Sequence, residues 1–164
     1  MQNNKNKETL EIYVLGDDFK YYENLKYLPL TSYPSNIQSA LIVYSLRGTA
    51  KISVHEDVHW IQPDELIILL PGQFVSFSEP SEDFLTVTMV ISSSMFGDAL
   101  SGVPRFSPHF FFYMRKNFST PLYDEECQRF IHFCNILIFR INLPRNLFRR
   151  ESIMQLLRVF YWDI

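Results

Sequence analysis

Cysteine and long apolar runs are both scarce in this sequence. The 164 residues include two cysteines, Cys127 and Cys134. They stand seven residues apart in a segment with helical spacing, which separates them by about 10 Å, too far for a disulfide bond. We expect both thiols to be reduced core residues. No apolar stretch is long enough for a signal peptide or a membrane span, so we expect no membrane contact and a cytoplasmic location.

Positive charge is also in short supply. The formal net charge is −3 and the pI is about 5.8. The basic residues are dispersed, apart from short clusters such as Arg149-Arg150. A domain that grips a nucleic-acid backbone normally carries a basic face. We therefore expect this chain to make no DNA contact by itself.

Motifs of the common catalytic classes are missing. The sequence has no G-x-S-x-G elbow, no H-E-x-x-H helix, no P-loop and no dinucleotide fingerprint. Paired carboxylates such as Asp64-Glu65 fall at expected turns or helix starts, which are solvated positions. We expect no catalytic residues and no cofactor, and we interpret the chain as a binding protein rather than an enzyme.

What the sequence does contain is a series of short β-type segments between Leu10 and Ser92. They are rich in β-branched and aromatic residues, and turn signals such as Pro71-Gly72 and a hairpin at Glu56-Asp57 separate them. The segments predicted as strands include residues 40–46, 49–54, 65–70, 73–78 and 84–92. This regular spacing predicts a barrel or a jelly roll.

From about Ser93 the apolar period becomes helical. A short capped helix and a bridging segment rich in Phe and Pro precede a longer helix that begins with the acidic residues 124–126. A second long helix closes the chain. The predicted fold is therefore mainly β with C-terminal α, in one structural domain. Its β part covers residues 1–92 and its helical part covers residues 93–164.

The last helix carries two apolar seams. One consists of Ile153, Leu156 and Phe160. The other has coiled-coil spacing and consists of Met154, Leu157, Tyr161 and Ile164. We predict that the second seam forms a dimer interface. The alternative is that both seams are internal core, since helical stripes do not distinguish the two cases. No stop signal follows this helix, so we expect a longer parent protein.

The segment from Ser45 to Glu79 resembles the N-terminal sensor domain of AraC-family transcription regulators. In that family an apolar strand ends in glycine, a hairpin follows, and a proline-acid pair introduces an apolar strand that ends in Pro-Gly. Here these elements are Gly48, the hairpin at Glu56-Asp57, Pro63-Asp64 and Pro71-Gly72. With the later FSPHFFFYMRKN run and Pro121, the resemblance extends from about Leu41 to the chain end.

The resemblance implies a cupin-like jelly-roll barrel followed by two longer helices. It also implies a small-molecule effector in the barrel, a homodimer, and a helix-turn-helix DNA-binding domain that is absent from this chain. DNA would then be bound only through that missing domain.

The predicted effector site is the barrel interior. Small-molecule sites are mostly apolar with a few polar groups. The side chains predicted to face inward and bind the effector are Tyr44, Ile52, Val75, Phe77, Leu85, Val87 and Met89. The alternative is a barrel filled by its own side chains, which would leave a ligandless dimerisation module.

A metal site is the third possibility. Glu65 and Gly72 have the separation found in metal-binding cupins, and His55 and His59 precede them. Those cupins use an H-x-H pair, however, whereas these histidines flank an expected turn. First-row metals also usually take at least three such ligands. We expect no metal ion, and a stand-alone metal-dependent cupin enzyme is the alternative to a sensor domain.

Overall fold

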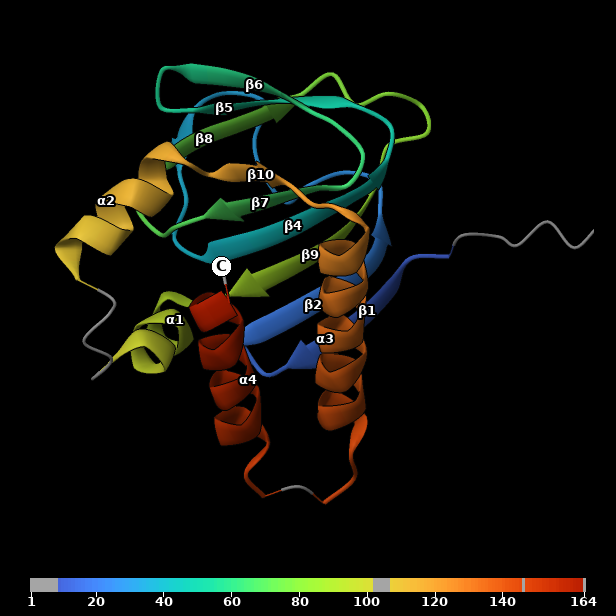
Figure 1. The fold of residues 1–164 in the computed structure, drawn as a ribbon, viewed down its shortest axis with the longest axis vertical. Coiled ribbons are helices and arrows are strands. Elements are labelled where there is room, and N and C mark those ends of the chain that lie inside the picture. The colour runs from blue at the N-terminus through green and yellow to red at the C-terminus, as the bar shows by residue number, and fades with distance from the viewer. Residues whose placement is uncertain (1–8, 102–106, 146, 164) are drawn as a thin grey trace, which may run out of the picture.

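The computed structural model describes residues 9–101, 107–145 and 147–163. Two antiparallel sheets face each other, and the helices of the described residues follow β9 (Leu85–Ile91), with one short strand, β10 (Ser119–Pro121), between the second and the third helix (Figure 1). The six-stranded sheet has the order β1 (Glu11–Leu15), β2 (Phe19–Leu25), β9, β4 (Ala40–Arg47), β7 (Glu65–Leu69) and β10. The four-stranded sheet has the order β3 (Ser35–Asn36), β8 (Phe74–Ser78), β5 (Ala50–Val54) and β6 (Asp57–Ile61). The predicted fold class, a jelly roll followed by helices, is confirmed.

The strands form where the alternation predicts them. Along β5 the side chains of Ala50, Ile52 and Val54 are buried and those between them are half-exposed, because the outer face of this sheet meets solvent. The hairpin at Glu56-Asp57 joins β5 to β6, and His55 adopts a φ of 54° there. Gly48 is required after β4, since a Cβ atom at this position would lie 2.5 Å from the Cα of Phe84.

The helices cover the outer face of the six-stranded sheet (Figure 1). They are α1 (Ser93–Leu100), α2 (Pro108–Lys116), α3 (Asp124–Asn142) and α4 (Arg149–Asp163). The side chain of Ser92 caps α1 by accepting a hydrogen bond from the backbone N–H of Met95 at 3.1 Å. At the start of α3, the Oε2 of Glu126 accepts from the N–H of Tyr123 at 2.8 Å. None of the helices within the described ranges combines the length and apolarity needed to cross a bilayer.

Two hydrophobic cores result, one on each face of the six-stranded sheet. Ile52, Phe77 and Phe84 belong to the core between the sheets. Phe130 and Leu157 belong to the core between that sheet and the helices. The sheet is therefore apolar on both faces, and β7 is buried at every residue.

Two elements differ from the sequence prediction. The bridging segment contains a helix, α2, and a short strand, β10, which pairs antiparallel with β7 through Ser119 and Ile67. The β part therefore takes a strand from beyond residue 92. Three residues ending in proline carry no strand signal of their own, so tertiary pairing alone creates β10. Gly102, the expected end of the first helix, lies outside the described residues.

Arg150 ties the start of α4 to the rest of the fold. Its Nε donates to Asp18 at 2.8 Å, and its Nη2 donates to Asp98 of α1 at 2.8 Å. Ser92 also donates to Asp18, at 2.8 Å. These hydrogen bonds, that from Arg150 first, hold the pKa of the Asp18 carboxyl below its ordinary range. The network joins the β1–β2 turn, α1 and α4.

We expect Arg150→Met to lower the free energy of unfolding by about 1 kcal/mol at pH 7, since the three side chains are partly exposed. Because the pKa of Asp18 is depressed in the folded state, its stabilising effect is present above the ordinary aspartate pKa of about 4 and is lost as the pH falls further. The difference between wild type and variant should therefore shrink between about pH 4 and pH 2. Urea denaturation across this range measures it. Arg115→Met, at an exposed α2 arginine, is the control, and an equal loss there would contradict the role of the network.

Candidate ligand cavity

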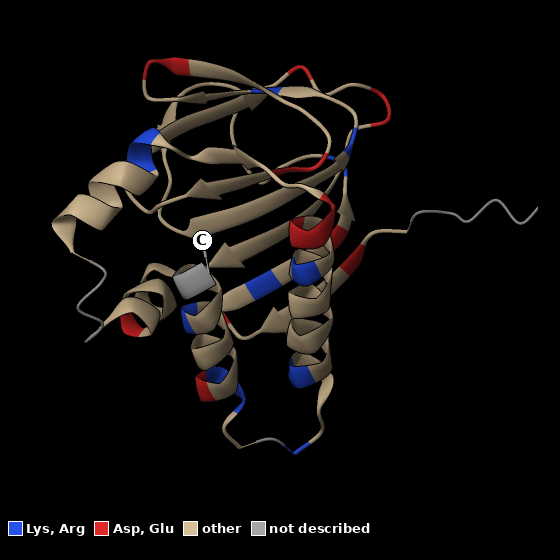
Figure 2. Ribbon diagram, in the orientation of Figure 1, with Lys and Arg blue, Asp and Glu red and all other residues tan. Residues whose placement is uncertain are grey.

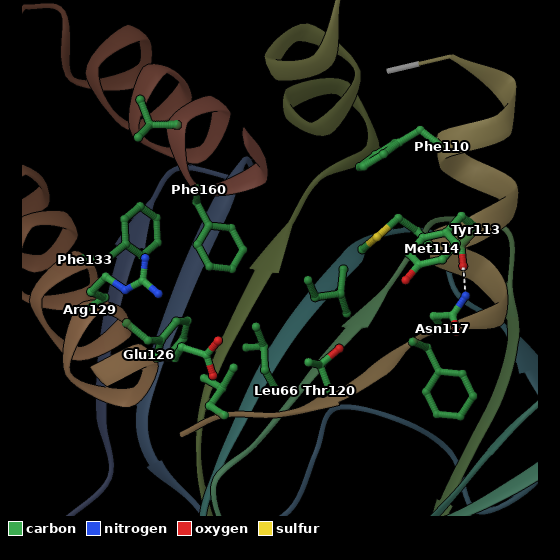
Figure 3. Close-up of a pocket in the computed structure, with 15 residues that line it drawn as sticks. Leu66, Phe110, Tyr113, Met114, Asn117, Thr120, Glu126, Arg129, Phe133 and Phe160 are labelled. Atoms are coloured by element: carbon green, nitrogen blue, oxygen red, sulfur yellow. Dashed lines mark hydrogen bonds between the residues drawn. The ribbon is translucent and has the colours of Figure 1, made fainter. Parts of the chain in front are cut away.

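A cavity of about 450 Å³ lies between the six-stranded sheet and the helices (Figure 3). It is outside the sandwich, on the face of the sheet that α2, α3 and α4 cover. Its walls are Leu66, Ile68, Phe110, Tyr113, Met114, Asn117, Phe118, Thr120, Leu122, Glu126, Arg129, Phe130, Phe133, Val159 and Phe160. The volume is within the range of small-molecule sites.

Helical and strand periodicities bring these side chains together. On β7, Leu66 and Ile68 face the helices, whereas Ile67 faces the core between the sheets. On α3, Glu126, Arg129, Phe130 and Phe133 recur at spacings of three and four, so they share one helix face. The strand β10 contributes Thr120 between the walls formed by α2 and α3 (Figure 3).

Aromatic rings dominate the wall formed by α3 and α4. Phe133 and Phe160 are stacked with their centroids 4.9 Å apart. Phe130 meets Phe160 edge-on at 5.9 Å and also contacts Tyr44 at 5.1 Å. Such rings give a large apolar contact area with few rotatable bonds. The α3–α4 side of the cavity is therefore a preformed aromatic surface.

Polar groups in the wall are few, and two of them are already engaged. Asn117 donates through Nδ2 to the carbonyl of Tyr113 at 2.9 Å, and Glu126 caps α3. Arg129 is exposed and supplies the positive charge of the wall, next to the negative charge of Glu126 (Figure 3). The charged groups balance, so the cavity favours a largely apolar ligand with a small number of polar contacts.

A second hollow, of about 410 Å³, lies beside the short strand β3. Pro29, Leu30, Leu41 and Val90 line it together with the polar residues Thr31, Ser35, Asn36, Gln38 and Ser39. Its wall comes mostly from one loop and the short strand β3. The helix-side cavity has more apolar surface and draws on more elements, which makes it the stronger ligand site.

The residues predicted to bind an effector are split between the two faces of the six-stranded sheet. Ile52, Val75 and Phe77 face the core between the sheets. Tyr44, Val87 and Met89 point the other way, toward the helices. Leu85 is buried at the start of β9. The expectation that all seven line one interior is wrong, because β4 and β9 are apolar on both faces and a continuous apolar run does not reveal which side is inward.

None of these seven side chains lines the helix-side cavity, whose walls are all described residues. Most of that wall comes from α2, β10, α3 and α4, and the sequence prediction placed no binding residue there. The available signal is the density of phenylalanine from Phe106 to Phe118, a segment for which the sequence predicts only a bridge between helices.

The three residues weighed as metal ligands, His55, His59 and Glu65, meet only in part. His59 Nε2 lies 2.6 Å from Glu65 Oε1, and Ser119 of β10 donates to the same oxygen. His55 stands apart at the β5–β6 turn, with its ring 6.3 Å from that of Phe74. The other oxygen of Glu65 accepts from the N–H of Gln62 at 2.8 Å. This buried carboxylate therefore joins β6, β7 and β10, and no set of three or more His, Cys, Asp or Glu able to hold a metal ion occurs among the described residues.

The two cysteines are free. Cys134 is buried, and burial raises the pKa of its thiol to about 12. It therefore remains protonated at neutral pH and has no nucleophilic character. Cys127 is half-buried, so the expectation of two core thiols holds fully only for Cys134.

The seam of α4 predicted to meet a second chain packs against its own chain instead. Leu157 and Tyr161 are buried in the core between sheet and helices, and Met154 is half-buried at its edge. Ile164 lies outside the described residues. Ile153 and Phe160 of the other seam are buried as well. In both seams every residue that the structure describes is buried or half-buried within this chain, so Leu157 and Tyr161 have no surface left to offer a partner.

Comparisons with known proteins give similarity of fold only. No family model matches the chain, and no curated protein matches it. Among solved structures, ToxT from Vibrio cholerae is 14% identical with a TM-score of 0.48, over 90% of this chain and 56% of the ToxT chain. An RmlC-like cupin family protein from Methanocaldococcus jannaschii is 9% identical with a TM-score of 0.39, over 56% of this chain and 86% of that one. KdgF from Halomonas sp. is 11% identical with a TM-score of 0.41, over 56% of this chain and 84% of that one.

Leu157→Ala distinguishes a core residue from an interface residue. We expect it to lower the free energy of unfolding by about 2–5 kcal/mol, as for other large-to-small core substitutions. The loss should be the same at low and high protein concentration, because the side chain packs within one chain. Chemical denaturation at two concentrations measures this, and Gln155→Ala on the exposed side of α4 is the control. A loss that appears only at high concentration would place Leu157 in an interface.

Proposed function

We propose that this chain is the effector-sensing and dimerising domain of an AraC-type transcription regulator. The observation that carries the proposal is the aromatic cavity of about 450 Å³, walled jointly by the sheet and by α4. The sequence resemblance supports the regulator class, and a net charge of −3 agrees with DNA binding through a separate helix-turn-helix domain. Such a regulator works in the cytoplasm as a binding protein rather than an enzyme.

The effector is a small, mainly apolar molecule. The cavity provides Leu66, Ile68 and Met114 from one side and the phenylalanines of α3 and α4 from the other. Burial of an apolar ligand here is favourable by about 25 cal/mol for each Å² removed from water. Tyr113 and Thr120 supply hydroxyl groups in the wall for orientation.

Ligand binding acts on α4 because hydrogen bonds from its arginines fix this helix to the rest of the chain, whereas its later residues border the cavity. Near its start, Arg150 bonds Asp18 and Asp98. Arg158 adds a hydrogen bond to the carbonyl of Ala99 at 2.7 Å. Farther along, Val159 and Phe160 border the cavity. A ligand that fits better against one position of Phe160 shifts the population of α4 toward that position, in proportion to its difference in affinity.

Titration with N-phenyl-1-naphthylamine, a neutral probe that fluoresces in apolar surroundings, tests the cavity. We expect saturable binding of one probe per chain. Thr120→Trp should weaken this binding at least tenfold, because Thr120 lies on the exposed edge strand β10 and a larger ring there fills the cavity without disturbing the core. Val58→Trp, at an exposed position of β6, is the matched control and should bind as wild type does.

Hydrogen exchange in the same samples tests the link to α4. Bound probe should slow exchange at the amides near Phe160 more than at those of β5, which is remote from the cavity. Absence of saturable binding, or equal weakening by both tryptophan variants, would contradict a sensing role for the cavity.

A further inference from the structure

The strand β1 is an open edge of the six-stranded sheet. Among the described residues β2 is its one neighbouring strand, and its other side meets no strand (Figure 1). Proteins usually protect such an edge with a lysine, a proline or a bulge, because its unpaired N–H and C=O groups can bond a strand of another chain. The sequence EIYVL of β1 contains neither lysine nor proline, and its register with β2 is regular over all five residues.

The other outer strands of the two sheets are less open to such addition. The strand β10 has three residues and ends in Pro121, which has no N–H to donate. The strand β3 has two residues. The strand β6 is tied to β7 and β10 through His59, whose ring lies 2.6 Å from Glu65 and 3.2 Å from Ser119. Of the outer strands that the structure describes, β1 is therefore the one best able to accept a further strand.

One face of β1 is apolar and uncovered. Ile12 is 51% exposed and Val14 is 47% exposed, and Leu10 just before the strand is 46% exposed. Tyr13 and Leu15 point the other way and pack against the core under the helices. A strand added at this edge would place its own side chains about 4.5–5.5 Å from those of β1, measured between Cβ atoms. Apolar side chains at alternate positions of that strand would cover Leu10, Ile12 and Val14.

The strand β2 contributes less to this face as an added strand would meet it. Tyr22 stands opposite Ile12, and Lys20 stands opposite Val14. Tyr22 is half-buried and Lys20 is exposed. Both lie one strand farther from the open edge, by about 4.8 Å. The three apolar residues at the edge therefore decide which side chains fit on this face, and they favour β-branched ones.

The opposite face of β1 carries negative charge that no cation balances. Glu11 lies directly opposite Glu23 of β2, where the acidic segments of the two strands meet (Figure 2). Like charges in this arrangement repel each other. Burial raises the pKa of the Glu23 carboxyl, and the charge of Glu11 raises it further. Within the described part of the chain, no lysine or arginine forms an ion pair with either carboxylate.

This charge identifies the occupant of the edge. A second copy of β1 would present Glu11, Tyr13 and Leu15 on the same face, and none of these is basic. A strand with a lysine or arginine beside Glu11 would supply the missing positive charge. We propose that β1 binds an extended segment of another protein by strand addition, and that this segment alternates β-branched apolar residues with polar ones, a basic residue lying beside Glu11. The site is separate from the ligand cavity, to whose wall β1 contributes none of its described residues.

Fluorescence anisotropy with a labelled synthetic peptide tests the proposal. The peptide is Thr-Val-Thr-Val-Lys-Val-Thr with both ends blocked. Placed antiparallel to β1, it sets its valines beside Leu10, Ile12 and Val14 and its lysine beside Glu11. Wild type should bind it saturably within about 1–500 µM. Absence of saturable binding would overturn the proposal.

The apolar face is tested by the double variant Ile12→Thr/Val14→Thr. It should bind the peptide at least about fivefold more weakly, because threonine keeps the preference for a strand but removes apolar surface. Val58→Thr, at a residue 59% exposed on β6, is the matched control and should bind as wild type does. An unchanged affinity in the double variant would show that the peptide does not use this face.

A charge exchange tests the role of Glu11. Glu11→Lys should bind the lysine peptide about tenfold more weakly, since one attraction is lost and one repulsion is added. It should also bind more tightly than wild type to a peptide that has glutamate in place of this lysine. Glu82→Lys, at an exposed turn, is the control and should change neither affinity. If Glu11→Lys binds both peptides equally well, the proposed pairing with Glu11 is wrong.

Amide hydrogen exchange distinguishes strand addition from other modes of binding. Bound peptide should slow exchange at those alternate amides of β1 that do not bond β2, and should leave the amides of β5 unchanged. Binding without this protection would overturn the proposal. Light scattering on the chain alone tests the other occupant. A dimer that Ile12→Thr/Val14→Thr abolishes would mean that a second copy fills the edge, and this too would overturn the proposal.

Discussion

The rest of the structure depends on one constraint, which is that the six-stranded sheet is apolar on both faces. Strand β7 is buried at every residue and β9 at nearly every residue, so each needs cover from both sides. The four-stranded sheet covers one face, and the helices must cover the other. A helix layer laid across a twisted sheet does not fill the space evenly. The cavity lies where α2, α3 and α4 diverge over β7 and β10.

This placement gives the cavity its significance. A ligand inside the sandwich would contact strands that are held in place by hydrogen bonds to neighbouring strands. A ligand on the helix side contacts α3 and α4 directly. The buried carboxylate of Glu65 holds β10 by its contact with Ser119, and β10 is the strand between the two helical walls. The same sheet edge therefore supports both the floor of the cavity and the segment that joins α2 to α3.

The helix α3 forms one wall of the cavity. Phe130 and Phe133 on its inner side border the cavity, and Phe133 stacks on Phe160 of α4. A ligand there would therefore contact α3 and α4 at once. Its effect on the two helices would equal the difference in its affinity for their alternative positions.

The sequence by itself determined the fold class and the types of most elements, but not those of α2 and β10. Strict alternation marks β5, and spacings of three and four mark α3 and α4, since these periods follow from backbone geometry. Only the tertiary structure decided which faces look inward. Tyr44 and Met89 point toward the helices rather than into the sandwich, and Leu157 and Tyr161 are core rather than interface. The apolar character of a residue predicts that it will be buried, but it does not identify the element that covers it. The strand β10 forms only because β7 has a free edge with which it can pair.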